Sequence, residues 1–159
     1  RSAGMALDLS NTDTLAELYE VRRILEPAAC AMAVANLTDS DLDTLAGHLQ
    51  SMRGAAAAED FVQADIAFHD TIAAIAGNPT LRAILQTLRS ESGLGLIRRA
   101  REEDGVEAEA ILEHEAILEA LRSRDSELAR AATTVHLAKG QRWLEGSTAD
   151  SVERADSRE

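Results

Sequence analysis

The feature that most constrains this sequence is an ionisable pair set within an apolar helical stripe. Asp65 and His69 are four residues apart, so a helix places them one turn apart on the same face. At ~100° per residue, that face also carries apolar residues around the pair: Val62, Ile66, Ile72, Ala73 and Ala76. A carboxylate and an imidazole directed into a core are costly unless a partner compensates them, and a metal ion is the most economical partner. The chain must therefore fold so that further ligands reach this face.

Length and composition favour one helical domain. The chain has 159 residues, of which 45% are hydrophobic and 28% charged, and this is enough for one sizeable core. Only 3% of the residues are aromatic and 2 are prolines, while helix-forming Ala, Leu, Glu and Arg are abundant. No segment has the alternation typical of strands. The sequence predicts an all-α fold, an antiparallel bundle of about six or seven helices with a central cavity for a metal or ligand.

The charge balance argues against several classes of partner. With 28 acidic and 16 basic residues the net charge is −12, and a surface this acidic repels phosphate backbones. Cys30 is the single cysteine, which excludes an internal disulfide and suits a reducing cytosol. No apolar run reaches the ~18 residues of a membrane span, and no signal-peptide pattern opens the chain. We therefore expect a cytoplasmic protein that contacts neither membrane nor, through these residues, nucleic acid.

The helical pattern divides the chain into three parts. Residues 1–11 have no clear period and predict a linker or arm, and residues 146–159 predict a polar C-terminal tail. Residues 12–145 between them predict the folded domain. Its expected helices cover approximately residues 12–35, 38–52, 59–76, 79–101, 106–122 and 126–144.

Capping residues, glycines and prolines predict where these helices begin, end or weaken. Thr38-Asp39-Ser40-Asp41 is typical of a helix N-cap, and Asp125 or Ser126 is expected to cap the last helix. Gly77-Asn78-Pro79 predicts the end of one helix and the start of the next. Pro27 should kink or break the first helix, and Gly93 and Gly95 mark a possible weak point in the fourth.

Three of the four histidines fall on apolar faces of different predicted helices. His69, His114 and His136 have apolar neighbours on their own faces, whereas His48 has polar ones and is expected at the surface. Together with Asp65 they offer one carboxylate and three imidazoles, a set that suits Zn, Ni, Mn, Fe or Co. A six-coordinate ion would leave positions open for water or a small carboxylate, whereas tetrahedral Zn would be a closed structural site. The remaining alternative is three hydrogen-bonded core histidines without a metal.

Arg22 is the other candidate, because it lies within the apolar stripe of the first predicted helix. It can pair with Glu26, one turn later, or reach into a cavity and bind the carboxylate of a ligand through both arms of its guanidinium. The two roles are compatible, since Glu26 can orient the arginine.

Several motifs together resemble a known family. The segment from Leu18 to Ala29, Leu-Tyr-Glu-Val-Arg-Arg-Ile-Leu-Glu-Pro-Ala-Ala, resembles the opening helix of the FCD domain. This is the C-terminal effector-binding domain of the FadR subfamily of GntR transcription regulators. Further segments follow the pattern of the family in order: Asp65-Ile-Ala-Phe-His69, Ala76-Gly-Asn-Pro79, His114-Glu-Ala-Ile-Leu118 and Val135-His-Leu137. The resemblance covers residues 15 to 143.

The resemblance implies specific roles for six residues. Those expected to bind a divalent metal, Zn, Ni or Mn, as in the metal-binding branch of the family, are Asp65, His69, His114 and His136. Arg22 matches the arginine that contacts the carboxylate of an effector. Asn78 matches a family asparagine that either lines the effector cavity or caps a helix, and the cap is favoured.

The resemblance also implies a regulatory function. It predicts a homodimer that binds a small organic acid, for example lactate, glycolate, gluconate or citrate. A winged helix-turn-helix domain is expected before residue 1, so that only the full-length protein would bind DNA. The alternative is a helical-bundle metalloenzyme acting on a small carboxylate. It would need a general base, and the sequence offers only peripheral acids such as Glu113 and Glu115, which flank His114 but lie off its face. We therefore expect a sensor and not an enzyme.

Overall fold

The computed structural model describes the backbone of residues 12–100 and 106–156, and the side chains of residues 14–92 and 107–144. Within these residues there are six α-helices and no strands, which confirms the predicted all-α class. The helices are α1 (Thr12–Ala33), α2 (Asp39–Arg53), α3 (Ala58–Ile75), α4 (Pro79–Ala100), α5 (Val106–Arg122) and α6 (Ser126–Asp156). No helix in the described parts is long and apolar enough to cross a membrane. The predicted linker, residues 1–11, lies outside the described residues.

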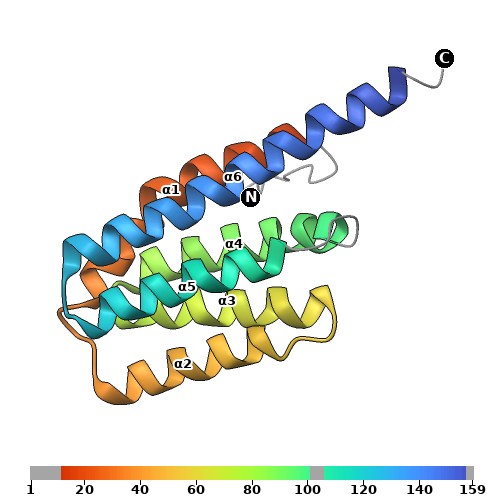
Figure 1. Cartoon of the computed structure of the whole chain (residues 1–159). Coiled ribbons are helices and arrows are strands. Elements are labelled where there is room, and N and C mark those ends of the chain that lie inside the picture. Colours follow the sequence, from red (N-terminus) through yellow and green to blue (C-terminus); the bar gives the residue numbers. More distant parts are fainter. Residues whose placement is uncertain (1–11, 101–105, 157–159) are drawn as a thin grey trace, which may run out of the picture.

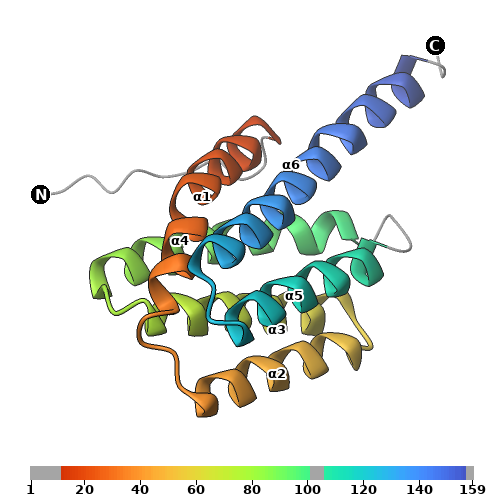
Figure 2. The ribbon, with the colours of Figure 1, turned by 60° about the vertical axis from the view of Figure 1, so that its left-hand side comes forward.

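The helices are arranged in three layers (Figures 1 and 2). Helices α1 and α6 lie side by side on one side of the bundle, α3, α4 and α5 form its middle, and α2 covers the opposite side against α3 and α5. The main hydrophobic core lies between α1, α2, α3 and α5. A second cluster joins α1 to α6 through Leu15, Leu18, Tyr19, Leu137 and Leu144.

The helix starts follow the predicted capping residues. Thr38 and Asp41 form a reciprocal capping box, in which Thr38 Oγ1 accepts from the Asp41 amide and Asp41 Oδ2 accepts from the Thr38 amide. Of the two alternatives for α6, Asp125 is the cap, since its Oδ1 accepts from the amides of Glu127 and Leu128.

Of the two alternatives for Pro27, a break is excluded, because α1 continues through it. The structure differs from the prediction in α6, which continues to Asp156 although an end near Leu144 was expected. The distal half of α6 extends beyond the other helices (Figure 1). Gly146 did not end the helix because a glycine costs a helix only about 1 kcal/mol, and no proline follows it to stop the hydrogen-bonding ladder.

The turn between α3 and α4 depends on a glycine. Gly77 has φ of 78°, in the left-handed region that side chains other than glycine adopt at a cost. A Cβ at this position would also lie 3.2 Å from Nδ2 of Asn36, which donates to the carbonyl of Ile75 and ties the end of α3 to the turn that follows α1. The turn therefore favours glycine at position 77 for both its backbone conformation and its close neighbour.

Replacing Gly77 by Ala should destabilise the domain by about 1–2 kcal/mol, because the new side chain disfavours the left-handed backbone. Gly47→Ala is the matched control. Gly47 is exposed within α2, and a Cβ added there would have no neighbouring atom within 4 Å, so this change should stabilise by about 0.5–1 kcal/mol. Urea unfolding measures both, and equal effects of the two changes would contradict the role of Gly77.

Candidate functional site

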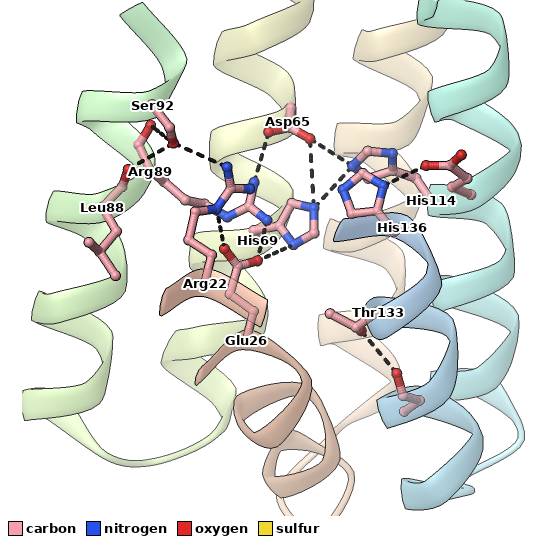
Figure 3. A network of polar contacts seen from close by, with 12 residues as sticks. Arg22, Glu26, Asp65, His69, Leu88, Arg89, Ser92, His114, Thr133 and His136 are labelled. Atoms are coloured by element: carbon pink, nitrogen blue, oxygen red, sulfur yellow. Dashed lines mark hydrogen bonds and ion pairs between the residues drawn. The ribbon is translucent and has the colours of Figure 1, made fainter. Parts of the chain in front are cut away.

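The four predicted metal ligands lie together in the interior of the bundle. Helix α3 supplies Asp65 and His69, α5 supplies His114, and α6 supplies His136 (Figure 3). One potential ligand atom from each residue lies within 4.8 Å of those of the others. His114 is fully buried, and His69 and His136 are only 6% and 9% exposed. Three helices distant in sequence thus direct a carboxylate and three imidazoles at one point.

Each of the three histidines in the cluster has an oxygen atom close to its Nδ1. These acceptors are the Ala110 carbonyl at 2.6 Å from His114, Glu113 Oε2 at 2.8 Å from His136, and Glu26 Oε2 at 3.4 Å from His69. Carbonyl and carboxylate oxygens only accept, so these contacts favour the tautomer that carries its proton on Nδ1. In the neutral ring the lone pair is then on Nε2, which is the arrangement that outer hydrogen bonds impose on histidines that bind metals.

The Nε2 atoms converge with the carboxylate of Asp65. His114 Nε2 lies 3.1 Å from His69 Nε2 and 2.8 Å from Asp65 Oδ1, and His69 Nε2 lies 3.6 Å from the same oxygen. With the protons on Nδ1, these three atoms are all acceptors at close range. Their mutual repulsion is relieved by a cation placed between them, and the nitrogen and oxygen donors suit a divalent transition metal. The residues therefore fit the predicted ion.

Burial and neighbouring charges keep these groups in the protonation states that metal binding requires. Burial alone would raise the pKa of Asp65, but the charge of Arg89 and the neighbouring imidazoles of His114 and His69 hold it well below its ordinary value. Burial and the charge of Arg89 lower the pKa of His69 well below its ordinary value, and burial and His114 lower that of His136. At neutral pH the carboxyl is ionised and these two imidazoles are neutral.

Two arginines and a glutamate extend the cluster into a buried charge network. Arg89 Nη1 donates to Asp65 Oδ2 at 2.9 Å, and its Nη2 donates to Glu26. Arg22 Nε donates to the other oxygen of Glu26 at 2.7 Å, and its Nη1 donates to Ser92 Oγ at 3.1 Å. Burial would raise the pKa of Glu26, but Arg89 and Arg22 lower it below its ordinary value. The network has two cations and two anions, so its charges balance internally.

Arg22 makes the pair with Glu26, and its role in binding the carboxylate of a ligand stays a prediction. It is 2% exposed, with its guanidinium 4.3 Å from the centre of the Tyr19 ring. Tyr19 lies against Gly140 of α6, where a Cβ would approach the ring to 2.9 Å. Glu26 and Tyr19 thus hold the arginine in one orientation.

A pocket of about 160 Å³ lies beside the cluster, and we call it the His136 pocket. Asp65, His136 and Arg22 form part of its wall. Its other lining residues are Tyr19, Ala58, Phe61, Val62, Glu107, Glu109, Ala110, Glu113, Lys139, Gly140 and Trp143. A ligand in this pocket would reach both a predicted metal ligand and the buried arginine.

Asn78 and His48 lie away from the cluster. Asn78 is exposed at the start of α4, where its Oδ1 accepts from the Leu81 amide at 3.0 Å and caps the helix. Its role in effector binding stays a prediction. His48, expected at the surface, is half-buried because its Nε2 lies 3.2 Å from Oγ1 of Thr71 on α3.

The sequence did not predict that Arg89 joins the charge network or that Glu113 accepts a hydrogen bond from His136. Arg89 follows Leu81 and Leu85 at helical spacing, so a charged residue on the inward stripe of α4 was the available signal. Glu113 has no such signal. It reaches His136 only because α5 and α6 pack against each other.

Replacing Arg89 by Met should destabilise the metal-free protein by about 3–5 kcal/mol, because Asp65 and Glu26 would lose their buried counter-charge. Arg82→Met is the matched control. Arg82 also binds a carboxylate through two hydrogen bonds, to Asp70, but its side chain is 42% exposed, so the expected loss is below about 1 kcal/mol. Urea unfolding in the presence of a chelator measures both, and similar losses would argue against a buried network centred on Arg89.

Comparison with known proteins gives one family. The FCD domain matches residues 17–139, most of the chain. The galactonate operon transcriptional repressor of Escherichia coli K12 is 27% identical over 135 residues, which cover 84% of this chain and 59% of the repressor. The HTH-type transcriptional repressor NanR of Citrobacter rodentium is 32% identical over 144 residues, which cover 85% of this chain and 53% of the repressor. The chain thus spans little more than half the length of these relatives.

Solved structures show the same fold. Escherichia coli McbR/YncC superposes with a TM-score of 0.75 at 24% identity, over 86% of this chain and 70% of the other. Streptococcus agalactiae GntR superposes with a TM-score of 0.73 at 21% identity, over 89% of this chain and 63% of the other. At these identities the structural similarity shows the fold alone. Because the family match covers most of the sequence and the relatives are transcriptional repressors, we conclude that the chain belongs to the FCD domain family of GntR-type transcriptional regulators.

Proposed function

We propose that this chain is the ligand-sensing and dimerisation domain of a bacterial transcriptional regulator, in the metal-binding branch of the FadR subfamily. It would bind a small organic acid at a divalent metal and thereby change DNA binding by the full-length protein. The observation that supports this most strongly is the convergence of Asp65 with the Nε2 sides of His69 and His114. The third imidazole, His136, is anchored in the same way through its Nδ1.

Asp65, His69, His114 and His136 would hold the ion, with Zn, Ni or Mn as the expected metals. When bound, the metal supplies a positive centre to which a carboxylate oxygen can bind. The protein's own residues do the rest: Glu26, Glu113 and the Ala110 carbonyl keep the imidazoles in the ligating tautomer.

The His136 pocket has the chemistry to receive a small acid. Arg22 provides a guanidinium that is always charged. Lys139 lies on the same wall, where it pairs with Glu109 and Glu113. Trp143 and Tyr19 offer apolar faces, while Glu109 can accept hydrogen bonds from hydroxyl groups. A hydroxylated carboxylate would satisfy all of these groups. Galactonate is a suitable probe, since it appears in the name of one of the relatives.

Helix α1 offers a route from the ligand to the DNA. It carries Arg22 and Glu26 in the buried network, and it directly follows the expected linker at residues 1–11. A ligand that binds two arrangements of a homodimer with different affinity shifts the population toward one of them. We expect the linker to carry that shift to a winged helix-turn-helix domain.

The metalloenzyme alternative gains no support from the side chains beside the cluster. Glu113, the better placed of the two candidate bases, accepts a hydrogen bond from Nδ1 of His136. Glu115 pairs with Arg53 at the surface. Glu113 lines the pocket, but both carboxylates are already paired with a basic side chain, which argues against either of them as a general base.

Elemental analysis tests the metal. The protein purified without a histidine tag should contain about one divalent transition metal per chain, and His136→Ala should lose most of it because one ligand is removed. His48→Ala is the control and should keep the metal, since His48 lies outside the cluster. If neither the unchanged protein nor the control takes up Zn, Ni or Mn after soaking, the metal-based mechanism is wrong.

Tryptophan fluorescence tests the effector. Trp143 is the only tryptophan and lines the His136 pocket, so galactonate titrated into the metal-loaded protein should change its emission. Arg22→Lys keeps the charge beside Glu26 but loses the bidentate hydrogen bonds that a guanidinium can make to a carboxylate. It should weaken galactonate binding about tenfold. Arg23→Lys, one residue along and exposed, should have little effect. Equal affinity in the two variants would exclude Arg22 as the residue that grips the carboxylate.

A further inference from the structure

The His136 pocket extends along two neighbouring helices, α5 and α6, which run antiparallel (Figure 1). Residues one turn apart line it on each helix: Glu107, Ala110 and Glu113 of α5, and His136, Gly140 and Trp143 of α6. Each set spans about 10 Å along its helix, at about 1.5 Å per residue. The pocket is therefore long enough to place two different groups of one small ligand in different surroundings.

The buried end of the pocket, formed by Arg22, Asp65 and His136, favours an anion. Arg22 is 2% exposed and His136 is 9% exposed, and the side chain of Asp65 is 14% exposed. A divalent ion held by Asp65 and His136 would add two positive charges beside the guanidinium. This is the end at which the function proposed above places the carboxylate of the effector.

The outer end of the pocket is acidic. Glu107 and Glu109 lie in the first turn of α5 and both line the pocket, and the side chain of Glu109 is 67% exposed. Lys139 is the only basic residue among the described ones that line this end, and its Nζ is shared between Glu109 Oε1 at 2.9 Å and Glu113 Oε1 at 3.2 Å. One ammonium group does not balance three carboxylates, so an excess of negative charge remains here.

Glu107 is the carboxylate of this end that has no ion-pair partner among the described residues. It is half-buried in the pocket wall. Trp143 lies toward the same end, because it follows Lys139 by one turn and Lys139 pairs with Glu109 near the start of α5. A carboxylate without a counter-ion and a tryptophan ring both attract cations.

We propose that the effector of the His136 pocket is an amino acid whose ammonium group is separated from its carboxylate by a short chain. The carboxylate lies at the buried end near Arg22, and the ammonium lies at the outer end near Glu107 and Trp143. This proposal rests on the function proposed above and narrows its class of ligand. A polyhydroxy acid meets the hydrogen-bonding groups of the outer wall but leaves its charge unbalanced, and a dicarboxylate is repelled by it.

Three ligands of similar length and different charge test the proposal: 4-aminobutyrate, butyrate and glutarate. Each is titrated by calorimetry, at low salt, into the zinc-loaded 159-residue chain from which excess zinc has been removed. All three present the same carboxylate to the buried end, so their order reports the charge of the outer end. We expect 4-aminobutyrate to bind about tenfold more tightly than butyrate, and glutarate to bind the least tightly.

Substitutions of Glu107 identify the residue responsible. Glu107→Gln removes the unpaired charge at nearly constant size and should reduce the preference for 4-aminobutyrate over butyrate to less than about threefold. Glu107→Lys reverses the charge and should make glutarate bind more tightly than 4-aminobutyrate. Glu127→Gln is the matched control and should leave the order and the preference unchanged. Glu127 is also an acidic residue in the first turn of a helix, α6, but it is exposed and does not line the pocket.

The outcomes separate this proposal from the function on which it rests. If butyrate or glutarate binds at least as tightly as 4-aminobutyrate, or if Glu107→Gln leaves the preference unchanged, the amino-acid class is wrong and a small organic acid remains the proposed effector. The same holds if galactonate binds and none of the three does. If the zinc-loaded protein binds neither galactonate nor any of the three, both the amino-acid class and the effector function are wrong.

Discussion

The structure depends on the placement of Arg89 between two buried carboxylates. Its guanidinium binds Asp65 on one side and Glu26 on the other, and it is 4% exposed. Without this cation, two ionised carboxylates and a group of imidazoles would share a core from which water is excluded, at a cost of several kcal/mol. Arg22 completes the balance from α1. The bundle can therefore keep an ionisable centre inside a helical core.

The same contacts orient the imidazoles. Glu26, which binds both arginines, also faces Nδ1 of His69, so the group that balances charge on α1 sets the tautomer on α3. Glu113 and the Ala110 carbonyl do the same for His136 and His114. The Nε2 atoms are left to face inward, and a cation bound there would depend as much on these outer contacts as on the ligands themselves.

The network also links elements that are distant in sequence. Helices α1, α3 and α4 meet in the pairs of Glu26 and Asp65 with Arg89, and α5 and α6 join them through His114 and His136. Glu26 and Arg22 place α1, the helix nearest the expected linker, in direct contact with this network. Such a shared, charge-balanced core is a suitable element for two alternative arrangements, because moving any one helix changes several buried pairs together.

Much of the site was predictable from the sequence because it follows helical periodicity. Asp65 and His69 one turn apart, and His114 and His136 on apolar faces, had to point into the core of any bundle these helices form. Helix starts were equally local, since Thr38 and Asp125 make their capping contacts within three residues. Only the tertiary structure determined which groups meet across helices. Arg89 with Glu26 and Asp65, Glu113 with His136, and the wall of the His136 pocket all depend on packing between residues far apart in the chain, for which a single sequence has no periodic signal.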